Sequence, residues 1–196
     1  AAIAAAGGFS PDANGDGMDD LLYRGIMGAD QIHPLYLRLS EPGNPLGKLI
    51  DVTASLPRPS STCFRVMLGA SHPVDVNGDG QVELYLASRQ FIGKSEHLSF
   101  GFQLLRWSSA TESFQSLEPY TEVYHGVPED PDVALCAFPE GTPLPSVAFG
   151  DVHGDGLPER LIQSETGGLQ SNQFGSAPGG FAPPVDIGIG LGVDHL

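Results

Sequence analysis

The sequence predicts an all-β protein built from about three repeated units, and three observations lead to this prediction. An acidic nine-residue segment occurs three times, beginning at positions 12, 75 and 151. Short apolar segments follow each copy. The chain also contains 26 Gly and 17 Pro, which suit tight turns and interrupt helices. Self-similarity on this scale is typical of repeat architectures, and we approximate the units as residues 1–60, 61–135 and 136–196.

Each unit is expected to contribute four short strands to one domain that spans residues 1–196. A strand directly follows each acidic segment, as in LLYRGI, LYLASRQF and RLIQSE. Further on, the closing stretch of each unit is expected to form a strand, a turn and a strand. Before the second and third acidic segments, CFRVMLGA and PSVAFGD supply a leading strand. Short strands at this spacing indicate a sandwich, barrel or propeller, and four-stranded units of roughly 40–50 residues are typical of propeller blades.

Charge and composition argue against several classes of protein. The chain has 24 acidic residues against 9 Lys and Arg, for a formal net charge of -15. This balance argues against nucleic-acid binding and against attraction to an anionic membrane surface. No apolar run approaches the roughly 18 residues of a membrane-spanning helix. The sequence has no His pair at zinc-ligand spacing, no nucleophile elbow and no phosphate loop, so we expect no enzymatic activity.

The acidic segments have the ligand pattern of a Ca²⁺-binding loop. Ca²⁺ takes six to eight hard oxygen ligands, and each segment carries acids at positions 1, 5 and 9. Glycines at positions 4 and 6 allow positive φ, while position 7 would contribute only its carbonyl. The predicted ligands are Asp12, Asn14, Asp16, Met18 and Asp20 in the first loop, Asp75, Asn77, Asp79, Gln81 and Glu83 in the second, and Asp151, His153, Asp155, Leu157 and Glu159 in the third.

Two other kinds of loop share part of this pattern. EF-hand loops need an acidic ligand at position 12, where this chain has Tyr23, Leu86 and Ile162. Asn-Gly and Asp-Gly also favour simple hairpin turns, but a bare turn does not require three acids in register. We therefore expect up to three Ca²⁺ sites. Because a neutral imidazole is a poor ligand for a hard cation, His153 should make the third site the weakest.

The pattern D-x-N-G-D-G-x-x-D/E followed by LLY or LYL resembles the FG-GAP and VCBS repeats. These repeats occur in integrin α-subunit heads, fungal propeller lectins and large bacterial surface or toxin proteins. The stretches LGKLIDVTASLP, GGFAPPVDIG and VAFGD also resemble parts of the family's blades. The resemblance covers almost the whole chain. It implies a β-propeller that holds Ca²⁺ in the loop between the first two strands of each blade, although His153 and the long units depart from the consensus.

The resemblance implies a non-catalytic, secreted or cell-surface module for adhesion, partner binding or scaffolding. A lectin-like carbohydrate binder and a shell segment of a large bacterial toxin or RHS-type protein remain alternatives, and the protein or glycan partner is open. Three units are too few for a usual propeller of about four to eight blades, so we expect further repeats of the same or another chain. The final GVDHL resembles the start of a fourth loop. Cys63 and Cys136 are expected to occupy equivalent places in neighbouring units and to remain unpaired.

Overall fold

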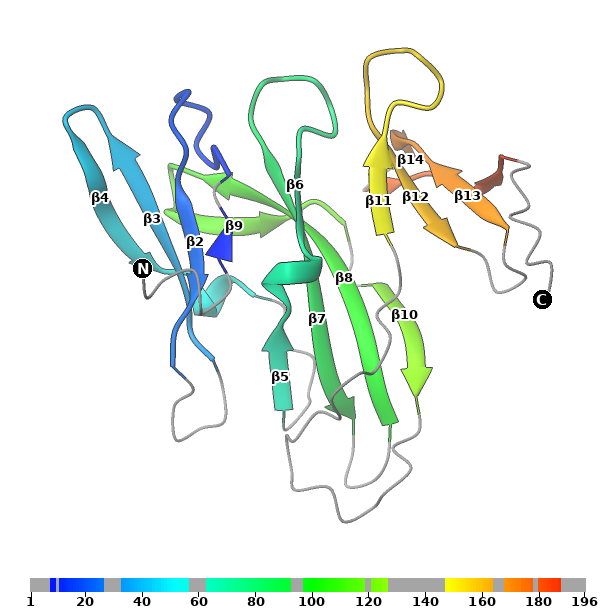
Figure 1. The fold of residues 1–196 in the computed structure, drawn as a ribbon, viewed down its shortest axis with the longest axis horizontal. Coiled ribbons are helices and arrows are strands. Elements are labelled where there is room, and N and C mark those ends of the chain that lie inside the picture. Colours follow the sequence, from blue (N-terminus) through cyan, green and yellow to red (C-terminus); the bar gives the residue numbers. More distant parts are fainter. Residues whose placement is uncertain are drawn as a thin grey trace, which may run out of the picture.

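The computed structural model describes residues 8–9, 11–26, 33–56, 63–92, 97–118, 121–126, 147–163, 168–177 and 180–187. Its described part is all-β, as predicted, with several antiparallel sheets and two short 3-10 helices (Figure 1). The described part contains no helix with the length and apolar character needed to cross a membrane.

The first sheet is a four-stranded meander in the order β1-β2-β3-β4. The 3-10 helix η2 (Thr53–Ser55) follows it. A tight turn at residues 42–43 joins β3 to β4, and strands that follow one another in the sequence are also neighbours in the sheet. Its strands are β1 (Gly8–Phe9), β2 (Leu21–Arg24), β3 (Leu35–Glu41) and β4 (Asn44–Asp51).

The second sheet is organised around the long hairpin of β7 and β8. Both β5 and β6 pair with β7, and both β9 and β10 pair with β8. The 3-10 helix η3 (Leu68–Ala70) separates β5 from β6. The strands of the second sheet are β5 (Cys63–Val66), β6 (His72–Val74), β7 (Glu83–Ile92), β8 (His97–Ser108), β9 (Ser113–Ser116) and β10 (Thr121–Gly126).

The third sheet has the order β11-β12-β13-β16, and a separate hairpin of β14 and β15 is inserted before its last strand. The predicted closing pattern of strand, turn and strand is therefore present here with an added hairpin. The strands are β11 (Val147–Gly150), β12 (Glu159–Gln163), β13 (Leu169–Asn172), β14 (Phe174–Ala177), β15 (Gly180–Phe181) and β16 (Val185–Asp186).

The second sheet packs against the first sheet on one face and against the third sheet on the other. Successive side chains of a strand point to opposite faces, so Leu84 and Leu86 join one core while Tyr85 and Ala87 join the other. The first core also contains residues of the first sheet, among them Leu22 and Leu37. The result is a series of three sheets in which the middle one is covered on both sides.

The structure differs in part from the fold that the sequence predicts. The leading strand expected across CFRVMLGA is interrupted, because η3 turns the chain between β5 and β6. Residues 124–126 lie in β10 and pair with β8. The described sheets form no closed barrel or propeller, so the number of blades remains a prediction. Cys136, the side chain of Cys63 and the C-terminal GVDHL lie outside what the structure describes.

Candidate metal-binding loops

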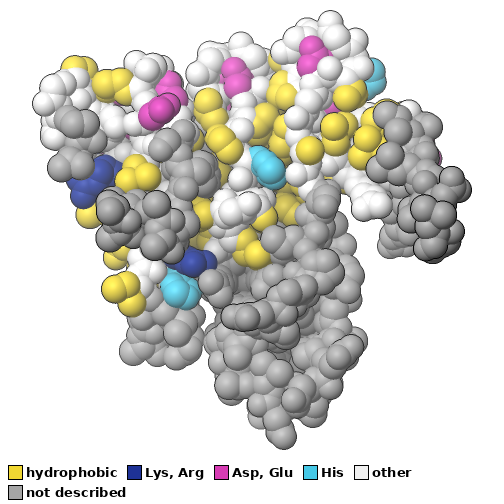
Figure 2. Space-filling view, in the orientation of Figure 1, with side chains coloured by type: hydrophobic (Ala, Val, Ile, Leu, Met, Phe, Trp, Pro, Cys, Tyr) yellow, Lys and Arg dark blue, Asp and Glu magenta, His cyan; other side chains and the backbone are white. Residues whose placement is uncertain are grey.

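Each acidic loop joins two strands that pair antiparallel. The first lies between β1 and β2, the second between β6 and β7, and the third between β11 and β12. All three loops project from the same edge of the molecule (Figure 1), and acidic side chains lie near their tips (Figure 2). The sheet series therefore places three similar loops side by side.

The backbone of the three loops is the same at the glycine positions. The glycines at positions 4 and 6 all have positive φ, with values from 73° to 88°. An L-residue costs roughly 1–2 kcal/mol in this left-handed region, which explains why glycine recurs there. These residues are Gly15, Gly17, Gly78, Gly80, Gly154 and Gly156.

Carboxylates inside each loop accept backbone N–H groups. The Asp at position 1 accepts hydrogen bonds from the glycines at positions 4 and 6, with N···O distances of 2.6 to 2.9 Å. The Asp at position 5 accepts the N–H of position 7 at 2.9 to 3.0 Å. In the first two loops, the position 3 amide nitrogen also donates to this Asp. The loops are thus wrapped around their own acidic side chains.

The acid at position 9 is the buried member of each loop. Asp20, Glu83 and Glu159 have exposed fractions of 1%, 0% and 0%. One oxygen of each accepts the N–H of position 2, which ties the two ends of the loop together. Burial raises the pKa of Asp20 and of Glu83, while the hydrogen bonds that each carboxylate accepts act in the opposite direction. The second oxygen of this acid has a different partner in each loop.

In the first loop, a backbone group takes the second oxygen. Oδ1 of Asp20 accepts a 2.8 Å hydrogen bond from the N–H of Ser40, which lies in β3 beyond the residues that pair with β2. Both oxygens of this buried carboxylate are therefore satisfied by backbone donors. Asp16 and Asp19 remain exposed at the rim of the loop.

In the third loop, the three acids converge. Single carboxylate oxygens of Asp151, Asp155 and Glu159 all lie within 4.8 Å of one another, which makes them the one such cluster in the described part of the chain. Oε1 of Glu159 is buried and accepts no directed hydrogen bond there, although Nδ1 of His153 lies 2.9 Å away. Contact with the Glu159 carboxylate raises the pKa of the exposed His153. Three hard oxygen donors at this spacing suit a divalent cation.

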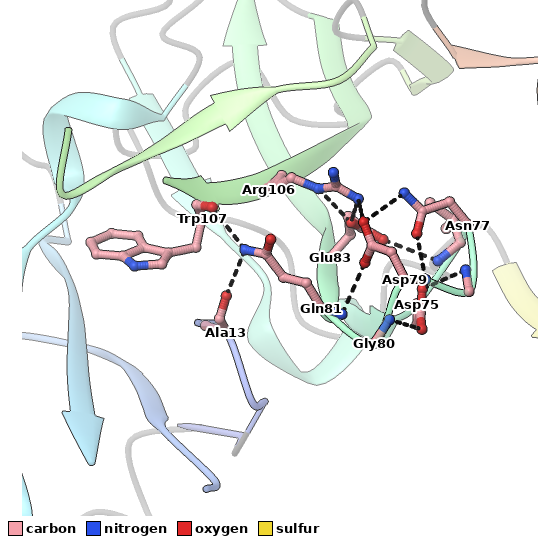
Figure 3. Close-up of polar contacts among 11 residues, drawn as sticks. Ala13, Asp75, Asn77, Asp79, Gly80, Gln81, Glu83, Arg106 and Trp107 are labelled. Atoms are coloured by element: carbon pink, nitrogen blue, oxygen red, sulfur yellow. Dashed lines mark hydrogen bonds and ion pairs between the residues drawn. The ribbon is translucent and has the colours of Figure 1, made fainter. Parts of the chain in front are cut away.

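In the second loop, an arginine contacts two of the acids, as Figure 3 shows. Arg106 on β8 donates from Nε to Oε1 of Glu83 at 2.7 Å, and its Nη2 contacts the same oxygen. Nη2 also lies 3.0 Å from Oδ2 of Asp79. The N–H of Gln81 is the main cause of the lowered pKa of Asp79, and Arg106 lowers that pKa further.

Sequence reasoning missed Arg106 as part of this loop. Leu84 pairs with Leu105 across β7 and β8, so the residues next to them, Glu83 and Arg106, lie opposite each other. The alternation within FQLLRWS, combined with this register, is the signal that could have identified the arginine. The register itself is not visible in either strand alone.

Neighbouring loops also touch through their position 7 side chains. Nε2 of Gln81 donates to the carbonyl of Ala13 in the first loop at 3.1 Å and to the carbonyl of Trp107 at 2.8 Å (Figure 3). A Cβ added at Gly78 would lie 3.1 Å from Cδ2 of Leu157 in the third loop. The sequence predicts that position 7 contributes only its carbonyl, whereas in the structure its side chain also packs against the neighbouring loop.

Comparison of the chain with protein-family models, with curated proteins and with solved structures finds no match in any of the three. The function is therefore inferred from the loops and from the packing of the sheets.

Proposed function

We propose that this chain is a non-catalytic, calcium-binding repeat module that forms about three blades of an FG-GAP/VCBS-type β-propeller. The observation that carries the proposal is the threefold repetition of one loop, in which a buried acid at position 9 accepts the N–H of position 2. A simple hairpin turn does not require acids at positions 1, 5 and 9 in three copies, and in the third loop the buried acid keeps one oxygen that accepts no directed hydrogen bond in the described part of the chain.

The donor chemistry supports Ca²⁺ as the ligand. The loops offer carboxylate, amide and carbonyl oxygens, which hard cations prefer, and they lack thiolates. The third loop supports the proposal best, because Asp151, Asp155 and Glu159 converge and Oε1 of Glu159 accepts no directed hydrogen bond in the described part of the chain. A bound divalent cation would offset the repulsion among these three carboxylates.

The packing of the sheets supports a serial, blade-like arrangement. Each core cluster joins the second sheet to one neighbour only, the first sheet in one case and the third sheet in the other. Sheets that each contact only adjacent sheets are typical of repeat proteins, including propellers. We therefore propose that further repeats, from this chain or another, complete the array.

We place the module outside the cell or at its surface. The resemblance of the three loops to the FG-GAP and VCBS repeats supports this location. Bound cations would order the shared loop edge, which could then serve adhesion, partner binding or scaffolding. The lectin alternative receives less support, because the single Trp of the chain, Trp107, is 2% exposed and packs on Phe114.

Calorimetric titration with CaCl₂, paired with thermal unfolding, tests the proposal. We expect Ca²⁺ to raise the melting temperature and a chelator to reverse the rise, since a ligand at 100 times its Kd stabilises a fold by about 2.7 kcal/mol. Asp155→Asn should reduce the number of sites by one. Glu41→Gln, at an exposed residue on β3, is the matched control for loss of one charge. Identical melting temperatures with Ca²⁺ and with chelator would refute the proposal.

A further inference from the structure

The second acidic loop already contains a positive charge from its own chain. Arg106 contacts Glu83 through Nε and Nη2 and contacts Asp79 through Nη2 (Figure 3). The Glu83 side chain is fully buried and that of Arg106 is 28% exposed. The guanidinium is therefore paired with two of the three carboxylates that would coordinate a divalent cation in this loop.

The equivalent residue in the other loops has no charge. Strand register places this residue opposite the acid at position 9, on the third strand of the first two units and directly after β13 in the third. In the first loop, pairing of Leu21 with Arg38 puts Leu39 at this place. In the third, pairing of Arg160 with Asn172 puts Gln173 there, and its Nε2 donates to Oδ2 of Asp155 at 2.7 Å. Leu, Arg and Gln thus distinguish three loops that share their glycine positions and carry an acid at positions 1, 5 and 9. The third loop differs further at position 3, where Nδ1 of the exposed His153 lies 2.9 Å from Oε1 of Glu159.

We propose that Arg106 acts as a tethered cation that closes the second loop without metal and lowers the affinity of that loop for divalent ions. The inference rests on the proposed calcium-binding function and adds a residue that sets which loops are occupied. Charge-assisted hydrogen bonds from a planar guanidinium to carboxylates are among the stronger polar contacts. A divalent ion must either break these contacts or bind beside a like charge, and both routes weaken binding.

The consequence is a difference in calcium dependence among the loops. The first and third loops should order as Ca²⁺ is added, while the second should keep its shape in chelator. We expect the affinity of the second loop for Ca²⁺ to be at least tenfold below that of the third. The second loop would then be the weakest Ca²⁺ site, because of Arg106. The sequence pattern alone predicts instead that His153 makes the third site the weakest.

The test isolates the second loop. In a protein carrying Asp16→Asn and Asp155→Asn, the first and third loops lose the carboxylate at position 5, and titration with CaCl₂ should show at most weak binding. Adding Arg106→Gln, which introduces the residue type found at position 173, should increase the Ca²⁺ affinity at least tenfold. Arg106→Lys should give a smaller increase, because it keeps the charge but loses the two-pronged contact. Lys48→Gln on β4, outside the loops, controls for the change in net charge.

A second measurement uses the unaltered protein, so the outcome does not depend on how a variant folds. Hydrogen exchange should show new protection at residues 151–159 as Ca²⁺ is added, with little change at residues 75–83. Equal protection of both loops at the same Ca²⁺ concentration would overturn the inference while leaving the calcium-binding function intact. Unchanged affinity in the Arg106→Gln protein would overturn it likewise. Absence of Ca²⁺ binding at every loop would overturn both.

Discussion

Arg160 donates a 2.9 Å hydrogen bond from Nη1 to the phenolic oxygen of Tyr85, across the boundary between the third and second sheets. The guanidinium also lies 4.1 Å from the ring centroid of Phe181 and 3.6 Å from Oε1 of Glu118. Tyr85 is 1% exposed, and burial raises its pKa to about 12. This polar group is embedded in the apolar core that joins the two sheets.

Replacing Arg160 should lower the free energy of unfolding more than removing the hydroxyl of Tyr85. Arg160→Met leaves Glu118 buried without its cation, and breaking a buried pair in this way costs about 3–5 kcal/mol. Tyr85→Phe removes one hydrogen bond and should cost about 1 kcal/mol. Urea denaturation of both variants measures the difference. Equal losses would show that the ion pair with Glu118 contributes little.

The stability of this boundary should depend on pH through Glu118. Burial raises the pKa of Glu118 above the ordinary value of 4.5, and the charge of Arg160 acts against that rise. The folded state then holds this proton more tightly than the unfolded state does. The resulting stabilisation is complete below the unfolded pKa and is lost as pH rises through the folded pKa.

Comparison of the wild-type protein with Glu118→Gln isolates this contribution from the other acids. In chelator, the stability of the wild type relative to the variant should fall as pH rises from about 4 to about 7. Urea denaturation at a series of pH values provides the measurement. A relative stability that increases over this range would mean that attraction to Arg160 outweighs burial.

The contact between the second and third loops can be measured with two glycines. Gly78→Ala adds a Cβ 3.1 Å from Cδ2 of Leu157, in a backbone with φ of 73°. Gly80→Ala meets no described atom within 4 Å, so it reports only the backbone cost at φ of 87°. We expect Gly78→Ala to be more destabilising by about 1 kcal/mol, because the tight contact adds to the strain. In a Leu157→Ala background the two substitutions should cost the same.

Glu159→Gln should have effects of opposite sign in chelator and in calcium. Without metal, the substitution relieves the repulsion between Glu159 and the two acids Asp151 and Asp155, and it also weakens the contact of Glu159 with the exposed His153. Because two repulsive neighbours outweigh one exposed attractive neighbour, the variant should be more stable than the wild type by about 1 kcal/mol. With Ca²⁺, the variant lacks a ligand and should gain less from the ion. Thermal unfolding in both conditions is the measurement, and a variant less stable than the wild type in chelator contradicts the account.

The parts of the fold that follow from local pattern were predictable from sequence. The apolar segment LYLASRQF and the alternation within FQLLRWS predict β7 and β8, and the glycine spacing predicts the shape of the three loops. The sequence could not show which strand lies beside which in the second sheet, where β7 pairs with two strands on the same side. That arrangement depends on η3, a single short turn whose sequence is mostly apolar.

The candidate metal-binding loops were likewise predictable only in part. The ligand types follow from composition and spacing, but the differences among the loops come from residues far away in the sequence. Arg106 lies 23 residues beyond Glu83, and only the pairing of β7 with β8 brings them together. Burial of the position 9 acids was likewise not visible, because Asp and Glu are ordinarily surface residues.

Neighbouring loops contact each other in the same way: the position 7 side chain of one loop packs on the position 4 glycine of the loop before it. This regular contact affects how the number of repeats can change. Leu157 lies against Gly78, and Gln81 lies against Gly15, where an added Cβ would be 3.6 Å away. Both contacts between neighbouring loops therefore use a position 4 glycine and a position 7 side chain. An in-frame deletion of one whole unit would therefore bring a position 7 side chain back onto a glycine, and a duplication would create another contact of the same kind. Insertions or deletions of whole units would preserve the contact between a position 7 side chain and a position 4 glycine, whereas those of part of a unit would remove it.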